Sequence, residues 1–182
     1  MKKLALIIVL ACTFIACEEC PERYTQSSAE IDTFKEVIAA YEAADWENYT
    51  AKFADTAKVY HNTDDKSMTP AETVEAHKTT TSGLSSYGFV SDKGDVEMVT
   101  TDKGETWVNY WGLWKGTIAS TGTEMMIPVH VTAQFVDGKV VEEYGYWDTA
   151  ALVAALTAAA SEDASEEGME QAAEEGAEES EQ

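Results

Sequence analysis

Two adjacent carboxylates, Glu142 and Glu143, lie in a run of β-forming residues that ends at Trp147. Successive side chains of a strand point to opposite faces, so only one of the two can enter the interior of a sheet-based fold. Burial among tryptophan rings would desolvate a carboxylate, which favours its neutral form and suits proton transfer. The alternative is a solvated acid at the rim, because charged residues are seldom fully buried without a partner.

The three histidines are weaker candidates for chemistry. His130 lies in the run Ile127–Phe135, whose odd positions are apolar, so strand alternation sends its side chain to the outer face. His61 is expected to face away from the side chains on either side of it, and His77 falls on a helix that we expect to be exposed. Their spacing matches no metal motif and no carboxylate cluster supports one, so we predict neither a metal nor a cofactor.

The remaining candidates for ligand binding are aromatic and amide side chains: Tyr60, Asn62, Trp107, Asn109, Trp111 and Trp147. The tyrosine and the first asparagine share one face of a short strand over residues 58–62 and could orient an oxygen atom of a ligand. A core tyrosine and a turn asparagine explain that pair equally well. The tryptophans could stack on an aromatic ligand or simply fill a core, and Asn109 needs a hydrogen-bond partner if it is buried.

Helices come first among the elements that must position these groups. Residues 27–30 (SSAE) and 69–72 (TPAE) have the pattern of capping boxes, the second with proline at the first helical position, so a helix is predicted to begin at each. Asp45 can cap a short helix between them, which would carry the aromatic residues up to Phe53 on one side.

Strands follow. Four runs rich in Val, Thr and aromatic residues predict them: Phe89–Thr101, Thr106–Ser120, Met125–Val136 and Val140–Trp147. Asp137-Gly138 favours a tight hairpin between the last two, and Asp148 is expected to cap a closing helix. Helices followed by an antiparallel meander predict an α+β domain in which helices cover one face of a curved sheet.

This order of elements resembles the SnoaL-like branch of the NTF2-like superfamily over residues 30–156. The segments that carry the resemblance are Ile127–Thr132 and above all the final strand, DGKVVEEYGYWD over Asp137–Asp148. The resemblance implies a cone in which N-terminal helices pack on a strongly curved mixed or antiparallel sheet around an apolar pocket. Members include polyketide cyclases, ketosteroid isomerases, limonene-epoxide hydrolases and proteins without known activity, so the fold alone gives no function.

The epoxide hydrolases show where this chain departs from its relatives. Their water-positioning Tyr-x-Asn is matched by Tyr60 and Asn62. The place of their catalytic base is taken by Gly145, and the places of their Arg and its partner Asp by Trp111 and Leu113. Epoxide hydrolysis by that mechanism is therefore not expected.

The same register implies that Glu143 is the inward carboxylate and that Trp107, Asn109 and Trp111 face the pocket. We therefore predict a domain that binds a small apolar or aromatic molecule, with Glu143 as the base of a cofactor-free proton transfer or hydrolysis. The alternative is a non-catalytic interaction module of the cell envelope whose pocket is filled by tryptophans.

The outer face of the sheet is predicted to be unusually aromatic for a solvated surface. Its predicted members are Tyr110, Trp114, His130, Tyr144 and Tyr146. An aromatic surface of this kind is typical of an interface, so we expect a homodimer, as in many relatives.

The N-terminal segment indicates where the protein is located rather than how it folds. Residues 1–16 have the charged start and short apolar run of a signal peptide. Phe14-Ile15-Ala16-Cys17 resembles a bacterial lipobox, with Phe where the box prefers Leu, so Cys17 is the predicted lipid attachment site and residues 17–29 a lipidated linker. Cys12 and an ordinary cleaved signal are the alternatives. The expected location is the bacterial envelope, at the outer membrane or cell surface of a two-membrane cell.

Charge limits the possible partners. The 182-residue chain has 12 basic and 34 acidic residues, a net charge of −22. Residues 161–182 hold ten acidic residues and no basic one, and we expect them to form a solvated, disordered tail. The predicted domain, residues 30–160, is also acidic. Nucleic acid is excluded as a partner, because phosphate binding needs a basic surface.

Overall fold

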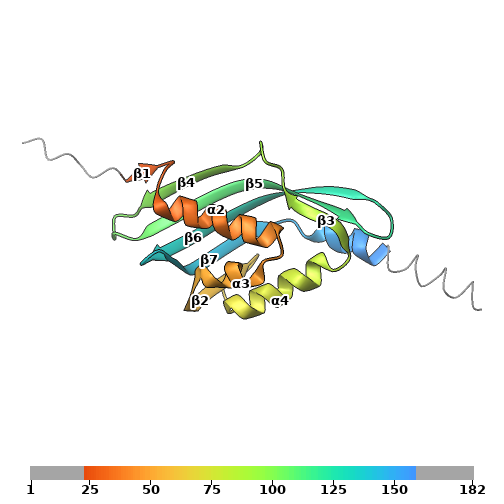
Figure 1. The fold of residues 1–182 in the computed structure, drawn as a ribbon, viewed down its shortest axis with the longest axis horizontal. Helices are drawn as coiled ribbons and strands as arrows, with labels where there is room; N and C mark the ends of the chain where they lie inside the picture. Colours follow the sequence, from red (N-terminus) through yellow and green to blue (C-terminus); the bar gives the residue numbers. More distant parts are fainter. Residues whose placement is uncertain (1–22, 159–182) are drawn as a thin grey trace, which may run out of the picture.

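A mixed, curved sheet of seven strands carries its helices on one face, which gives the predicted α+β class (Figure 1). The computed structural model describes residues 23–158. The predicted signal peptide, lipid attachment site and acidic tail lie outside the described residues. Among residues 23–158, no helix is both long and apolar enough to span a membrane.

Helices α2 (Ala29–Glu42) and α4 (Pro70–Thr81) begin at capped turns. Thr69 and Glu72 form the predicted capping box of α4. Helix α2 begins one residue later than the capping-box pattern predicts, because its N-cap is Ser28, whose hydroxyl accepts the N–H of Ile31 at 3.2 Å. Both caps satisfy backbone N–H groups that have no partner within the helix.

The short helix α3 (Trp46–Ala51) is capped by Asp45, as predicted, but it ends before Phe53. Phe53 instead opens strand β2 (Phe53–His61), where it pairs with Val140 and is buried. The prediction of a short strand over 58–62 therefore missed its first half. The pairing of β2 with β7, which is distant in sequence, makes residues 53–57 a strand. The local sequence does not show this pairing.

The strand order in the sheet is β1-β4-β5-β6-β7-β2, with β3 paired to β5. The remaining strands are β1 (Tyr24–Thr25), β3 (Leu84–Phe89), β4 (Asp95–Thr100), β5 (Thr106–Ile118), β6 (Glu124–Val136) and β7 (Lys139–Trp147). The predicted single strand over residues 89–101 is observed only over β4, since β3 ends at Phe89 and residues 90–94 are not in a strand; β3 and β4 both pair antiparallel with β5. The β2–β7 pair is parallel, so the sheet is mixed.

The hairpin between β6 and β7 turns at Asp137-Gly138, where φ is +51° and +73°. These angles are the left-handed pair that a two-residue hairpin requires, so the predicted turn is confirmed. After β7 the chain continues into a helix over residues 150–158, where Asp148 accepts the N–H of Ala150 at 2.8 Å.

Burial defines an inner face of the sheet, which meets the helices, and an outer face. On β6 the odd positions point inward, as predicted, and Ile127, Ala133 and Phe135 are buried. On β5 the inward residues are Val108, Tyr110 and Trp114, while Trp111 is 44% exposed on the outer face. The epoxide-hydrolase register implied that Trp107, Asn109 and Trp111 of β5 face inward, and this prediction is wrong.

Candidate functional site

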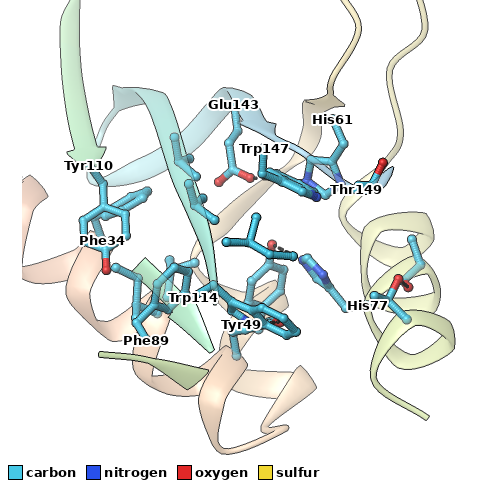
Figure 2. Close-up of a pocket in the computed structure, with 18 of the residues that line it drawn as sticks. Phe34, Tyr49, His61, His77, Phe89, Tyr110, Trp114, Glu143, Trp147 and Thr149 are labelled. Atoms are coloured by element: carbon cyan, nitrogen blue, oxygen red, sulfur yellow. Dashed lines mark hydrogen bonds and ion pairs between the residues drawn. The ribbon is translucent and has the colours of Figure 1, made fainter. Parts of the chain in front are cut away.

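A cavity of about 210 Å³ lies between the inner face of the sheet and the helices (Figure 2). Its polar groups are a carboxylate, two imidazoles, two threonine hydroxyls, tyrosine hydroxyls and the indole N–H groups of two tryptophans. Most of the wall is aromatic or aliphatic, and its aromatic members are Phe34, Tyr41, Tyr49, Phe89, Tyr110, Trp114 and Trp147. Such a cavity suits an apolar molecule that carries one or two polar groups.

Glu143 is the carboxylate of this cavity. It comes from β7, is only 5% exposed, and turns its carboxylate into the cavity (Figure 2). Its Oε1 lies 3.9 Å from Nε2 of His61, and none of the described residues donates a hydrogen bond to it. The structure thus places Glu143 on the inner face, as the register implied; its catalytic role stays a prediction.

His61, rather than its two neighbours, enters the cavity from β2. Strand alternation puts it on the same face as Val59, which is fully buried. Tyr60 points outward and stacks on Tyr144, with ring centroids 4.7 Å apart. Asn62 follows the strand in a left-handed conformation, and its side-chain oxygen accepts the N–H of Trp147 at 2.9 Å. The expectation that Tyr60 and Asn62 orient a ligand in the pocket is therefore wrong.

His77 lines the same cavity from α4, although the sequence led us to expect an exposed position. Its Nε2 lies 3.4 Å from Oη of Tyr49, and its ring is 5.5 Å from that of His61. Burial, with a smaller contribution from His61, lowers the pKa of His77 to about 3, so the imidazole is neutral at pH 7. A helical signal existed, because His77 follows the buried Thr73 and Val74 by four and three residues.

The tyrosine hydroxyls of the cavity remain protonated at neutral pH. Burial raises the pKa of Tyr41 and Tyr49, and the carboxylate of Glu143 contributes to the second shift. Tyr41 accepts a hydrogen bond from Nε1 of Trp114 at 3.0 Å. These hydroxyls can therefore act as neutral hydrogen-bond donors or acceptors toward a ligand.

Trp107, Asn109 and Trp111 lie on the outer face, so the prediction that they line the pocket is wrong. Trp111 stacks on His130 with ring centroids 4.9 Å apart, and Asn109 accepts a hydrogen bond from Thr132 at 2.7 Å. Of the three predicted pocket tryptophans, only Trp147 is on the cavity wall.

Three inward aromatic rings each lie over a glycine two residues away on the same strand. The pairs are Tyr110 over Gly112, Trp114 over Gly116, and Trp147 over Gly145. A Cβ atom at any of these glycines would overlap the ring. The glycines therefore let the rings lie along the sheet, and an aromatic residue two positions from a glycine is the signal that identifies the inward face.

Within residues 23–158, no group of three or more His, Cys, Asp or Glu side chains is gathered to hold a metal ion. The cavity wall offers one carboxylate, two imidazoles, several hydroxyls and the indole N–H groups of its tryptophans. These groups can transfer protons and form hydrogen bonds.

Comparison with known proteins identifies the fold. No protein-family model and no curated protein sequence matches the chain. Among solved structures, a proposed polyketide cyclase from Xanthomonas campestris pv. campestris aligns over 72% of this chain and 99% of its own, with a TM-score of 0.58 and 13% identity. An NTF2-like protein of unknown function from Burkholderia pseudomallei aligns over the same shares, with a TM-score of 0.55 and 15% identity.

The fold is NTF2-like. A proposed SnoaL-like polyketide cyclase from Shewanella denitrificans is a further neighbour, aligned over 67% of this chain and 92% of its own, with a TM-score of 0.53 and 14% identity. Identities this low establish a common architecture only. The chemistry must therefore be argued from the cavity itself.

Proposed function

We propose that the NTF2-like domain binds a small molecule with an apolar or aromatic body in this cavity. The observation that supports the proposal is the nearly buried carboxylate of Glu143, which faces an open cavity with mostly apolar walls. A polar group of the ligand would meet Glu143 while its apolar body contacts the aromatic rings. Neighbours named as proposed polyketide cyclases agree with small-molecule binding by this fold.

The same geometry supports cofactor-free acid/base chemistry. Glu143 would accept a proton from the ligand or from a water molecule. The negative charge would then lie on the deprotonated species, and the nearby imidazole of His61 would stabilise it. Tyr49 and the neutral His77 would hydrogen-bond an oxygen atom of the ligand. The alternative of a non-catalytic module with a filled pocket is disfavoured, because the cavity is open as far as Glu143.

Adjacent carboxylates on opposite faces provide a matched test. Glu142 lies on the outer face, where it accepts a hydrogen bond from the Tyr144 hydroxyl at 3.0 Å. With 2-naphthylmethanol as a probe, we expect Glu143→Gln to weaken binding about tenfold or more, because hydrogen bonds to charged groups contribute roughly 1.5–3 kcal/mol. Glu142→Gln should leave affinity unchanged in isothermal titration calorimetry. Equal effects of the two substitutions would contradict the proposal, as would a wild-type protein that binds neither this probe nor its amine analogue 2-naphthylmethylamine.

We also propose that the domain is anchored in the bacterial envelope by a lipid on Cys17. Support comes from the order of a charged start, an apolar run and the cysteine. Two acyl signals give stable membrane attachment, and an acidic protein has little other affinity for a membrane surface. Cys17→Ala should move the protein from the membrane to the soluble fraction, while Cys20→Ala should not. Sedimentation of both variants with membranes would contradict the anchor.

Finally, we propose that the outer face forms a homodimer interface. Its membership differs from the prediction, because Tyr110 and Trp114 are on the cavity wall. The aromatic residues that share the outer face form two rows of stacked rings: Trp111, His130 and Tyr146, and Trp107, Tyr144 and Tyr60. Trp111 and Tyr146 are 44% and 45% exposed, which supports contact with a second copy.

A further inference from the structure

The geometry points to ligand selection by charge: we infer that the cavity prefers positively charged amines with an apolar body and rejects carboxylates. This inference rests on the proposed function and concerns the same site. It is carried by the distribution of charge on the wall, the carboxylate of Glu143, which accepts no hydrogen bond from the described residues, and the aromatic rings beside it.

The charges on the cavity wall favour a cation. Among the described residues that line it, Glu143 is the one acidic side chain, and no Lys or Arg is present. His61 is the basic group nearest the carboxylate, and His77 is neutral at pH 7. An anionic ligand would therefore meet no Lys or Arg on the described wall, and the carboxylate of Glu143 would repel it.

The carboxylate of Glu143 accepts no hydrogen bond from the described residues and is open to the cavity. Its contact with His61 is 3.9 Å, longer than a hydrogen bond, and the described residues supply no other donor. An ammonium group in the cavity would supply both the opposite charge and N–H donors to these acceptor oxygens, so a cationic ligand would form the hydrogen bonds that the protein leaves unmade.

Aromatic rings close to the carboxylate suit the same ligand. Trp147 lies four residues from Glu143 on the same strand face, and its ring borders the cavity (Figure 2). Tyr49 is close enough to Glu143 for the charge of the carboxylate to affect its pKa. The face of an aromatic ring attracts a cation, and the attraction grows when water is excluded. Together these groups resemble the aromatic enclosures that bind alkylammonium ions.

The net charge of the whole chain acts in the same direction. At −22, it concentrates cations around the protein and repels anions at low ionic strength. This field is not specific, so it assists the selection but does not produce it. The difference in affinity between compounds of equal size must therefore come from Glu143 and Trp147.

The test uses three compounds with one naphthalene ring: 2-naphthylmethylamine, 2-naphthylmethanol and 2-naphthoate. Calorimetric titration at pH 7 and 150 mM salt, with the full-length Cys17→Ala chain, should give an amine affinity at least tenfold above that of the alcohol, and no measurable binding of the acid. Glu143→Gln should bring the amine to within about twofold of the alcohol, whereas Glu142→Gln should leave the tenfold preference intact.

The outcomes separate this inference from the proposed function. If the alcohol binds as tightly as the amine, or the acid binds best, selection by charge is refuted while ligand binding in the cavity stands. A preference for the amine that persists in Glu143→Gln also refutes it, because a general effect of the acidic surface then explains the result. If none of the three compounds binds, the proposed function and this inference both fail.

Discussion

Nε2 of His61 lies 3.9 Å from Oε1 of Glu143, and the two side chains reach the cavity from parallel strands. In the ladder His61 is opposite Gly145, and Glu143 is opposite Val59, so the two groups meet diagonally across the β2–β7 pair. Gly145 has no side chain, which leaves room for the imidazole ring. The register of two strands that are distant in sequence therefore brings an imidazole and a carboxylate together on the described cavity wall.

This pair should be energetically coupled. A double-mutant cycle with His61→Gln and Glu143→Gln is expected to give a coupling free energy of roughly 1 kcal/mol in urea unfolding, because both groups are largely removed from water. The exposed pair Lys78–Glu75 is the control, with an expected coupling below about 0.5 kcal/mol. Additive effects of the two cavity substitutions would show that His61 and Glu143 do not interact.

Gly145 should be intolerant of a side chain. A Cβ atom there would lie 2.5 Å from Cζ3 of Trp147 and 3.3 Å from Cδ2 of His61, so the tryptophan ring must move. We expect Gly145→Ala to lower the free energy of unfolding by about 1–3 kcal/mol and to weaken probe binding. In the Trp147→Leu background, Gly145→Ala should lower the free energy of unfolding by much less. An equal cost in both backgrounds would mean that the ring is not what excludes the methyl group.

His77 should make stability fall in acid. Its pKa is lowered to about 3 in the folded state from the ordinary value of 6.5, so between these values the unfolded chain binds more protons. Stability is therefore lost as pH falls from about 6.5 toward 3, by roughly 1–2 kcal/mol at pH 5. The difference in unfolding free energy between wild type and His77→Gln should shrink by that amount between pH 7 and pH 5. A difference that does not change with pH would contradict a buried neutral imidazole.

The aromatic outer face should control the oligomeric state. Light scattering of the full-length Cys17→Ala chain is expected to give the mass of a dimer, and Trp111→Glu should convert it to a monomer, because a charge at this site would be buried in the interface. Val153→Glu places the same charge on the helix over residues 150–158, at a residue that is 59% exposed, and should leave the dimer intact. A monomer at high concentration in the unsubstituted protein would exclude this interface.

Features that depend on nearby residues could be predicted from the sequence. The capping box of α4, the Asp137-Gly138 turn and the inward odd positions of β6 each follow from residues within a few positions of one another. The face of β5 could not be decided in this way, because both of its faces carry large aromatic side chains. Pairing decides it: Tyr110 is opposite Val131, and cross-strand partners share a face.

The candidate site was predicted only in part for the same reason. Glu143 and Trp147 were placed on the inner face by the register of one strand, and the structure agrees. The inward orientation of His61 depends on the parallel pairing of β2 with β7, which puts Val59 opposite Glu143, and the burial of His77 depends on α4 packing over the cavity. Both are tertiary relationships that no local pattern in the sequence encodes.

Extraction of the purified protein followed by mass spectrometry tests the central claim most directly. Wild-type protein and a Val131→Phe variant, which fills part of the cavity, would be purified side by side and checked for folding by circular dichroism. We predict that an organic small molecule is recovered from the wild-type protein in an amount comparable to the protein, and that the variant releases several-fold less. Recovery of the same compound in equal amounts from both folded proteins, or of none from the wild type, would contradict a ligand-binding cavity at Glu143.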